Sequence, residues 1–362
     1  MALLKSGDKV RDVYTVETLI GEGTFSEVYR VKHHYLGRQA LKLFKTPCAS
    51  QEEVRLRLEE ASLLSHLGHP NIIRVFDANI LILNGQSHGY FTTEYLHGGN
   101  LEEFWQINHK GVFPLEMLME ILTQVTRGVS IAHSSNPAII HRDIKLQNIL
   151  IGFDGEKLRA VLCDFGLAKH VNSLTLLATA MGTLPFKPPE VFGDQHQEST
   201  ASDVWGIGCC FYLLLTGHFP YHVLEALNIK FFPTFKEEFI PASHFNVDVD
   251  EALDKIIQAS LEKDVKKRIP NANALLEELD SWRPDYHAKN HNLVNAHFVD
   301  LPAQSKTPGD LELMITQAEA LARFPGKLHL AAEILESVIT RNHLLAEKYT
   351  KKLNLWRKGL AG

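Results

Sequence analysis

The chain has 362 residues, which is enough for two or three domains. Its 45% hydrophobic and 22% charged residues are typical of a soluble globular protein, and a net charge of -6 with a pI near 6.3 argues against nucleic-acid or general membrane binding. No signal peptide or transmembrane segment is indicated, and the four cysteines lack metal-ligand spacing, so we expect a cytoplasmic protein with reduced thiols.

The first ninety-odd residues predict a small sheet with one helix. β-branched and aromatic residues alternate or cluster around glycines over 14–23, 26–34 and 38–45, which predicts three strands. Helical periodicity follows over 50–67, where Val54, Leu58, Ala61 and Leu64 share one face. Two more strands are predicted over 72–82 and 89–96.

The following part of the chain is mainly helical. Residues 115–135 predict a long amphipathic helix, and the apolar run at 204–217 predicts a buried one. The stretch IIHRDIKLQNILI, at 139–151, differs because charged and amide side chains stand between apolar flanks that predict two buried strands. A short strand is predicted over 157–166, and helices continue to Trp282.

The expected domain organisation has four parts. An N-terminal lobe covers 1–96 and a helical lobe covers 97–284, followed by an irregular linker over 285–310. Helical periodicity returns in a C-terminal segment over 311–362, which predicts two or three packed helices.

Gly21 and Gly23 in GEGTFSEVY lie between two predicted strands. A dinucleotide-binding fold needs a helix directly after such glycines, and here a strand follows. Two interpretations remain at this point: a tight turn, or a flap whose backbone amides cover phosphates while Val28 packs over a base.

Lys42 shares one face of a predicted strand with Ala40, because strand side chains alternate. It is either a surface lysine or a cation that faces a pocket. A carboxylate on the next helix would favour the pocket. Glu60 is preferred to Glu59 for this role because it shares a helical face with Leu64.

The polar cluster in IIHRDIKLQNILI suits phosphate chemistry. Asp143 can accept a hydroxyl proton, the amide oxygen of Asn148 can ligate a metal, and Lys145 can neutralise a phosphoryl group. Asp164, at the end of the next strand, is a second carboxylate suited to Mg²⁺. A hydrogen-bonded turn would explain Asp143 and Asn148 alone, but the combination with Lys42 favours a catalytic site.

The sequence resembles the eukaryotic-type serine/threonine protein kinases over about residues 14–282. The resemblance rests on GEGTFSEV, ALKLF, HRDIKLQN, DFG, PPE and DVWGIG, in the family's order. It implies an α+β bilobal protein-kinase fold: a small antiparallel N-lobe sheet with one helix and a mainly helical C-lobe, here followed by a small all-α segment. It also implies ATP and Mg²⁺ as cofactors and a protein substrate with a Ser/Thr acceptor.

The resemblance implies a role for each matching residue. Asp143 would be the catalytic base, Asn148 and Asp164 would hold Mg²⁺, and Lys42, paired with Glu60, would fix the α- and β-phosphates. Lys145 would contact the γ-phosphate, and Thr183 would hydrogen-bond toward Asp143. The implied nucleotide-binding set also contains the glycine loop with Gly21 and Gly23, the gatekeeper Thr93, the hinge from Glu94 to Leu96, and the base-sandwiching residues Ile20, Val28, Ala40 and Leu150.

Departures from the family pattern remove no charge that the chemistry needs. Ser26 replaces the third glycine, PPE replaces APE, and Phe186 stands where tyrosine is common. Glu190 is expected to pair with Arg268 in the core as a structural ion pair. HRDIK resembles serine/threonine rather than tyrosine kinases, and small-molecule kinases generally lack the GTLPFKPPE and DVWGIG blocks.

A regulatory switch is a further hypothesis. Arg142 is expected to lack an anionic partner unless a phosphate joins it, and Thr179, Thr175 and Ser173 are the candidate phosphorylation sites. A phosphate at Thr179 could dock on Arg142 and Lys169. The alternative is a kinase that is active without phosphorylation.

Two functions stay open for the main domain: an active kinase, or a nucleotide-binding pseudokinase scaffold that acts through its C-terminal helices. The intact set of Lys42, Glu60, Asp143, Asn148 and Asp164 favours the active enzyme. The C-terminal segment carries a basic cluster, which is either a solvated face over a packed core or a surface for a protein partner. The cluster comprises Lys348, Lys351, Lys352, Arg357 and Lys358.

Overall fold

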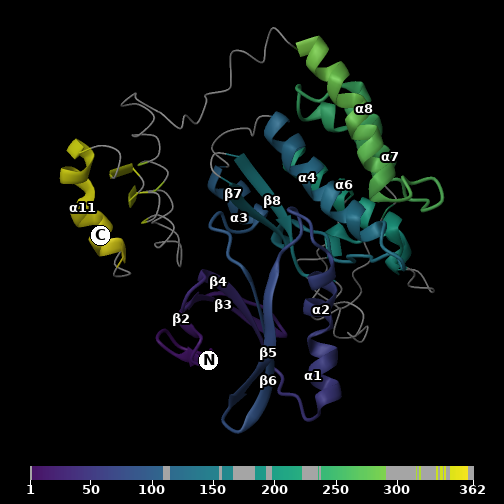
Figure 1. The fold of residues 1–362 in the computed structure, drawn as a ribbon. Coiled ribbons are helices and arrows are strands. Elements are labelled where there is room, and N and C mark those ends of the chain that lie inside the picture. The colour runs from purple at the N-terminus through teal and green to yellow at the C-terminus, as the bar shows by residue number, and fades with distance from the viewer. Residues whose placement is uncertain are drawn as a thin grey trace, which may run out of the picture. The chain divides into compact units, whose positions relative to one another are not determined.

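The fold is taken from a computed structural model of the whole chain (Figure 1). It describes residues 2–108, 115–154, 157–165, 184–192, 198–221, 235 and 238–290, and, in the C-terminal segment, 315, 318, 332, 335, 336, 338, 339 and 343–357.

The N-terminal part forms a six-stranded antiparallel sheet in the order β1-β2-β3-β4-β6-β5. The five strands predicted from periodicity are present, and a short strand, β1, precedes them unpredicted. The strands are β1 (Lys9–Val10), β2 (Tyr14–Glu22), β3 (Ser26–His33), β4 (Gly37–Phe44), β5 (Val75–Leu83) and β6 (Gln86–Glu94).

The two faces of this sheet carry different side chains. Tyr29, Leu41, Leu43 and Tyr90 are fully buried in an apolar core on one face. Since side chains alternate along a strand, Lys42 must project from the opposite face. The sheet therefore presents Lys42 on the face away from this core.

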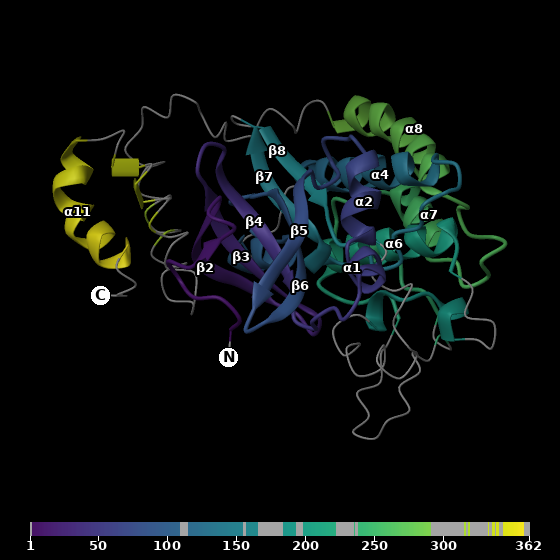
Figure 2. The same cartoon turned by 60° about the horizontal axis from the view of Figure 1, so that its bottom comes forward.

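The helix predicted over 50–67 is interrupted at Leu58. Helix α1 (Gln51–Arg57) begins after Ser50, whose side chain accepts a hydrogen bond from the Glu53 amide at 3.2 Å. Leu58 leaves helical geometry, with φ -92° and ψ 5°, and α2 (Glu59–His66) follows directly. Periodicity alone did not predict this break, because Leu58 keeps the apolar spacing. Helices α1 and α2 lie beside β5 and β6 in both views (Figures 1 and 2).

The helical part is organised around α6 (Thr200–Thr216), as the apolar run predicted. Its side chains are buried on nearly all sides, and the hydroxyls of Ser199 and Ser202 form a capping box at its start. Figure 2 shows α6 among the other long helices. These are α4 (Leu115–His133), α7 (Glu251–Ser260) and α8 (Ala272–Asn290), while α3 (Leu101–Asn108) follows the sheet in the chain. Helix α8 continues six residues into the segment where we expected a linker.

The prediction of strands on both sides of the polar cluster was half wrong. Strand β7 (Ile149–Asp154) follows the cluster and pairs with β8 (Lys157–Leu162). Residues 139–145 form no strand, because the backbone amides of His141 and Arg142 donate to the carboxylate of Asp203 instead of to a neighbouring strand.

The chain divides into two compact units, of which the first contains both the sheet and α4, α6 and α7. The second unit comprises 102–113, 154–157 and 288–362. In this second unit Leu335, Val338, Leu353 and Trp356 lie in an apolar core. All its described positions from 315 on are helical, including α11 (His343–Arg357). Among the described residues, no helix is both long and apolar enough to cross a bilayer.

Candidate active site

Lys42 is held by a carboxylate on the neighbouring helix, as predicted. Its Nζ lies 3.0 Å from Oε2 of Glu60 on α2, and both side chains are buried. Glu59, the rejected alternative, is exposed. Burial places Glu60 on the inner face of α2 together with Ala61 and Leu64. The strand and the helix thus supply the two halves of one ion pair.

Asp164 meets the same lysine from the helical part of the fold. Its Oδ1 lies 2.6 Å from Nζ of Lys42, and its side chain is 37% exposed. The backbone of Asp164 is left-handed, with φ 62°, a conformation that a non-glycine residue adopts at a cost of about 1–3 kcal/mol. Such strain commonly marks functional positions, and here it places a partly exposed carboxylate next to a buried cation.

One cation shared by two carboxylates sets the protonation of this cluster. Burial alone would lower the pKa of Lys42, but Asp164 and Glu60 outweigh it and hold that pKa above its usual range. Burial would likewise raise the pKa of Asp164, yet Lys42 keeps it below its usual value. Burial raises the pKa of Glu60 to about 7, with only partial compensation by Lys42. Lys42 and Asp164 are therefore ionised, and Glu60 is the group that titrates.

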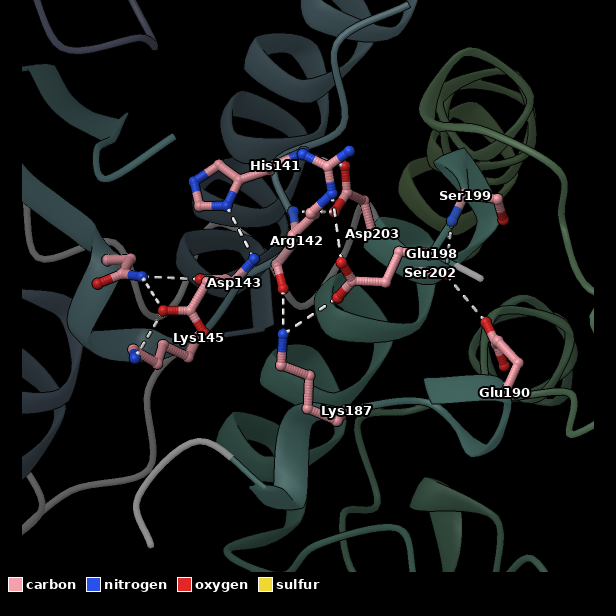
Figure 3. A network of polar contacts seen from close by, with 11 residues as sticks. His141, Arg142, Asp143, Lys145, Lys187, Glu190, Glu198, Ser199, Ser202 and Asp203 are labelled. Carbon is pink, nitrogen blue, oxygen red and sulfur yellow. Dashed lines mark hydrogen bonds and ion pairs between the residues drawn. The ribbon is translucent and has the colours of Figure 1, made fainter. Parts of the chain in front are cut away.

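Asp143 and its neighbours form a second polar cluster on the loop before β7. Its Oδ2 lies 2.8 Å from Nζ of Lys145 (Figure 3). The same oxygen accepts a hydrogen bond from Nδ2 of Asn148 at 3.0 Å. Nδ2 of Asn148 also donates to the Asp143 carbonyl at 2.7 Å. Because the amide nitrogen is committed to Asp143, Oδ1 is the atom with which Asn148 can ligate a cation.

His141 connects this loop to the Asp164 segment. Its Nδ1 accepts a hydrogen bond from the Asp143 amide at 3.2 Å, so Nε2 carries the proton and donates to the Cys163 carbonyl at 2.9 Å. Burial lowers the pKa of His141, which keeps the ring neutral. The ring also packs against Phe165, with centroids 4.5 Å apart. The two segments that carry Asp143 and Asp164 are thus tied by one side chain.

Asp203 on α6 anchors the loop that contains Asp143, a role that was not predicted although DVWGIG contains this residue. Its Oδ2 accepts from the His141 amide at 2.7 Å and its Oδ1 from the Arg142 amide at 2.8 Å. His133, at the end of α4, accepts from the Ala272 amide through Nδ1 and therefore donates through Nε2 to Asp203 at 2.9 Å. The loop is consequently fixed to α6, α4 and the start of α8.

The packing of α6 against this loop also explains a glycine. A Cβ on Gly206 would lie 3.0 Å from Cβ of Ile144 and 3.1 Å from its carbonyl oxygen. A side chain there would require Ile144 to move by a few tenths of an ångström, so glycine suits this close approach of helix and loop.

Arg142 has an anionic partner among the described residues, contrary to our expectation. Its Nε lies 3.2 Å from Oε2 of Glu198, and Nζ of Lys187 lies 3.3 Å from Oε1 of the same carboxylate. Lys187 also donates to the Arg142 carbonyl. No local sequence signal pointed to Glu198 or Lys187. Glu198 lies 56 residues from Arg142 in the chain, and only the fold brings the two together.

Two of the residues expected to sandwich the nucleotide base, Val28 and Ala40, lie on one face of the six-stranded sheet. Ala40 lies opposite Thr93 in the β4–β6 ladder, and Val28 lies opposite Lys42 in the β3–β4 ladder. Directly opposed residues share a face, so these four side chains project to the same side. Ile20 is near the end of β2 and is 37% exposed.

The segment after β6 reaches the helical part through β7. The Gly98 amide donates to the Ile151 carbonyl at 3.0 Å, and Asn100 forms a β-bridge with Leu150. Leu96 packs closely against Gly152: a Cβ added to Gly152 would lie 2.6 Å from Cδ2 of Leu96. Leu96 and Leu150 are therefore brought to neighbouring positions. The Glu94 carboxylate accepts from the Arg74 amide and pairs with Arg159.

The glycine loop turns tightly between β2 and β3, where the Gly23 amide donates to the Ser26 carbonyl at 2.8 Å. A Cβ at Gly21 would come no closer than 3.7 Å to its neighbours, and one at Gly23 no closer than 3.6 Å. The described packing does not require glycine at either position, whereas close approach of the backbone to a phosphate would.

The predicted structural pair of Glu190 and Arg268 is present. Nη1 and Nη2 of Arg268 lie 2.7 and 2.9 Å from the two carboxylate oxygens, and Ser202 donates to Oε1 at 3.0 Å. Thr183, the candidate phosphorylation sites Thr179, Thr175 and Ser173, and Lys169 lie outside the described residues.

Comparisons with known proteins agree with this geometry. The model of the protein kinase domain matches residues 14–279. A probable serine/threonine-protein kinase of Clostridium perfringens is 29% identical over 75% of this chain and 38% of its own length. Probable serine/threonine-protein kinase PknB of Lactococcus lactis is 28% identical over 76% and 43%, respectively. The chain thus spans less than half the length of these bacterial relatives.

Calcium/calmodulin-dependent protein kinase type 1B of Rattus norvegicus is 30% identical over 76% of this chain and 77% of its own length. The crystal structure of the PknI kinase domain of Mycobacterium tuberculosis matches 77% of this chain and 99% of its own, with a TM-score of 0.55 and 22% identity, and supports the fold. The sheet followed by a helical region, the two polar clusters and these matches show that the chain belongs to the protein kinase family.

Proposed function

We propose that this chain is an ATP- and Mg²⁺-dependent protein kinase that transfers the γ-phosphate of ATP to serine and threonine hydroxyls of proteins. The observation that carries the proposal is the pairing of Lys42 with both Glu60 and Asp164, across the sheet and the helical part. This pairing brings the lysine expected to bind phosphates next to the carboxylate expected to ligate Mg²⁺.

The described residues fit a magnesium nucleotide. Asp164 and Asn148 offer two oxygen ligands, and the described residues contain no group of three or more His, Cys, Asp or Glu side chains that could hold a metal alone. Mg²⁺ is typically bound by one or two carboxylates together with substrate phosphates and water. The pair would therefore hold Mg²⁺ together with a nucleotide, which supplies the transferred group and, with the metal, charge neutralisation.

The residues of the chain then divide the work of the transfer. Asp143 accepts the proton of the acceptor hydroxyl as the new oxygen–phosphorus bond forms and the bond from the γ-phosphorus to the β-phosphate oxygen breaks. Lys42 binds the α- and β-phosphates, and Lys145 stabilises charge on the transferred group. Most of the catalysis comes from positioning, which the bonds of Asp143 to Asn148 and Lys145 provide.

We extend the proposal to autophosphorylation, to a cytoplasmic location and to the C-terminal segment. We include autophosphorylation between 166 and 183, with Thr179 as the first candidate acceptor. The four free cysteines suit a reducing, cytoplasmic compartment. The packed core around Leu335, Val338 and Trp356 fits a folded module, and we propose that this module binds a protein partner.

The test is transfer of labelled phosphate from ATP with Mg²⁺, to the chain itself and to a basic protein, with Asp143→Asn as the comparison. We expect incorporation on serine and threonine that falls by at least about 10²-fold in the variant. Nucleotide binding without any transfer by the wild type would contradict the enzyme proposal and favour a pseudokinase scaffold. A version ending near Trp282 would then show whether the C-terminal segment holds the kinase inactive.

A further inference from the structure

All three polar parts of Arg142 are bound (Figure 3). Its amide donates to Asp203, its carbonyl accepts from Lys187, and its guanidinium pairs with Glu198. Its backbone is left-handed, with φ 69°, which is an unfavourable conformation for arginine. Residues persist in such conformations only where surrounding contacts hold them. Since Asp143 comes next in the chain, these contacts also set the position of the proposed catalytic base.

Glu198 closes this set of contacts into a ring. One oxygen contacts Arg142, the other contacts Lys187, and Lys187 returns to the Arg142 carbonyl. All three side chains are largely buried: Arg142 is 19% exposed, Glu198 18% and Lys187 11%. Ion pairs partly removed from water are screened less than surface pairs, and removing one member leaves the others uncompensated.

Glu198 is held in place by its position in the chain. It directly precedes Ser199, the N-cap of α6, and Asp203 lies within the first turns of the same helix. Two residues near the start of one buried helix therefore bind Arg142. Glu198 pairs with its guanidinium, and Asp203 accepts a hydrogen bond from its amide. The carboxylate of Glu198 is thus attached two residues before the first residue of a buried helix.

The charges of this ring are balanced only together with Asp203, which binds the Arg142 amide. Arg142 and Lys187 contribute two positive charges, and Glu198 and Asp203 contribute two negative charges, so these four groups have no net charge. A phosphate carries about -1.5 to -2 charges, and one that approached Arg142 would meet the Glu198 carboxylate.

We propose that Glu198 is a positioning residue whose carboxylate binds Arg142 in place of an activating phosphate, so that the catalytic loop has its working geometry without phosphorylation of 166–183. This inference rests on the kinase activity proposed above. Autophosphorylation there would then be a product of the activity and not a condition for it.

The test uses the full chain after phosphatase treatment, with the absence of phosphate checked by intact mass. Initial rates on a basic protein are measured for the wild type, Glu198→Gln, the conservative Glu198→Asp, and Glu120→Gln. Glu120 is a matched control because it also pairs with an arginine, Arg283 at 3.0 Å. The pair joins α4 and α8 away from His133 and Ala272, the positions through which these helices hold Asp203.

We expect the phosphate-free wild type to start without a lag, at a rate within about three-fold of the phosphorylated enzyme. Glu198→Gln should lower kcat roughly 10²-fold while KM for ATP changes less than about two-fold, because the loop and not the nucleotide site is displaced. Glu198→Asp should recover much of the loss, and Glu120→Gln should match the wild type. A lag that ends with phosphorylation, or a normal kcat for Glu198→Gln, would overturn the proposal.

Hydrogen exchange gives a readout that does not depend on activity. The peptide containing His141 to Lys145 should exchange faster in Glu198→Gln than in the wild type or Glu120→Gln, since the loop loses the contact that holds the Arg142 side chain and opens more often. Equal exchange would overturn the positioning role. Absence of transfer in every wild-type preparation would instead refute the kinase proposal, and the exchange comparison would still decide whether Glu198 holds the loop.

Discussion

The raised pKa of Glu60 makes the stability of the fold depend on pH in a defined direction. An unfolded Glu60 titrates at its ordinary value of 4.5, and the folded residue titrates at about 7. Between these values the native protein keeps a proton that the unfolded chain has released. The free energy of unfolding therefore falls as pH rises through this window, by about 1.4 kcal/mol per pH unit for one proton.

Glu60→Gln removes this titration while keeping the size of the side chain. The difference in stability between the wild type and the variant should decrease by roughly 3 kcal/mol across the window and become constant above it. Circular dichroism of urea unfolding between about pH 5 and pH 8 measures this difference. Glu59→Gln is the matched control for the loss of one carboxylate from α2, because Glu59 is the exposed neighbour of Glu60 on the same helix.

A second measurement follows the proton itself. The carboxyl carbon of Glu60, assigned by its loss in Glu60→Gln, should titrate in a ¹³C spectrum near neutral pH. A midpoint at its ordinary value, together with a difference in stability that does not change with pH, would refute the reasoning that one lysine serves two carboxylates.

Three further changes have defined outcomes. Glu190→Gln leaves Arg268 buried without its bidentate partner and should lower the free energy of unfolding by roughly 3–5 kcal/mol, measured by urea unfolding; a loss under about 1 kcal/mol would contradict this. Gly206→Ala should lower the free energy of unfolding by about 1–3 kcal/mol in urea unfolding, and it should lower kcat by displacing the loop that contains Asp143. Gly68→Ala, where a Cβ meets nothing within 4 Å, should change neither quantity. Thr179→Ala should leave initial rates unchanged, and a large loss with phosphate mapped at that residue would favour the phosphate switch instead.

Local patterns predicted the part of the candidate site that lies on the sheet and on α2. Strand alternation placed Ala40 and Lys42 on one face, and helical periodicity selected Glu60 over Glu59, because both relations repeat over a few residues. The interruption at Leu58 was not predicted, since a break in backbone geometry that preserves the apolar spacing leaves no trace in the pattern.

The support of the catalytic loop was not predictable in the same way. The apolar residues before His141 suggested a strand, but the amides that would have paired with a neighbouring strand bind Asp203 instead. Arg142 appeared to need a phosphate because no nearby residue in the sequence offered an anion. Its partner, Glu198, is brought in by α6, and contacts over such separations depend on the whole fold.

Helix α6 explains why these long-range contacts occur together. A helix buried on nearly all sides has little freedom to move, so groups at its start are fixed relative to the core. Gly206 lets the loop approach, Asp203 binds its backbone, and Glu198 binds its side chain. Ser202, in the first turn, donates to Glu190, which Arg268 holds in turn. The position of Asp143 is therefore set by the packing of one helix, and changes that loosen α6 should lower kcat before they unfold the protein.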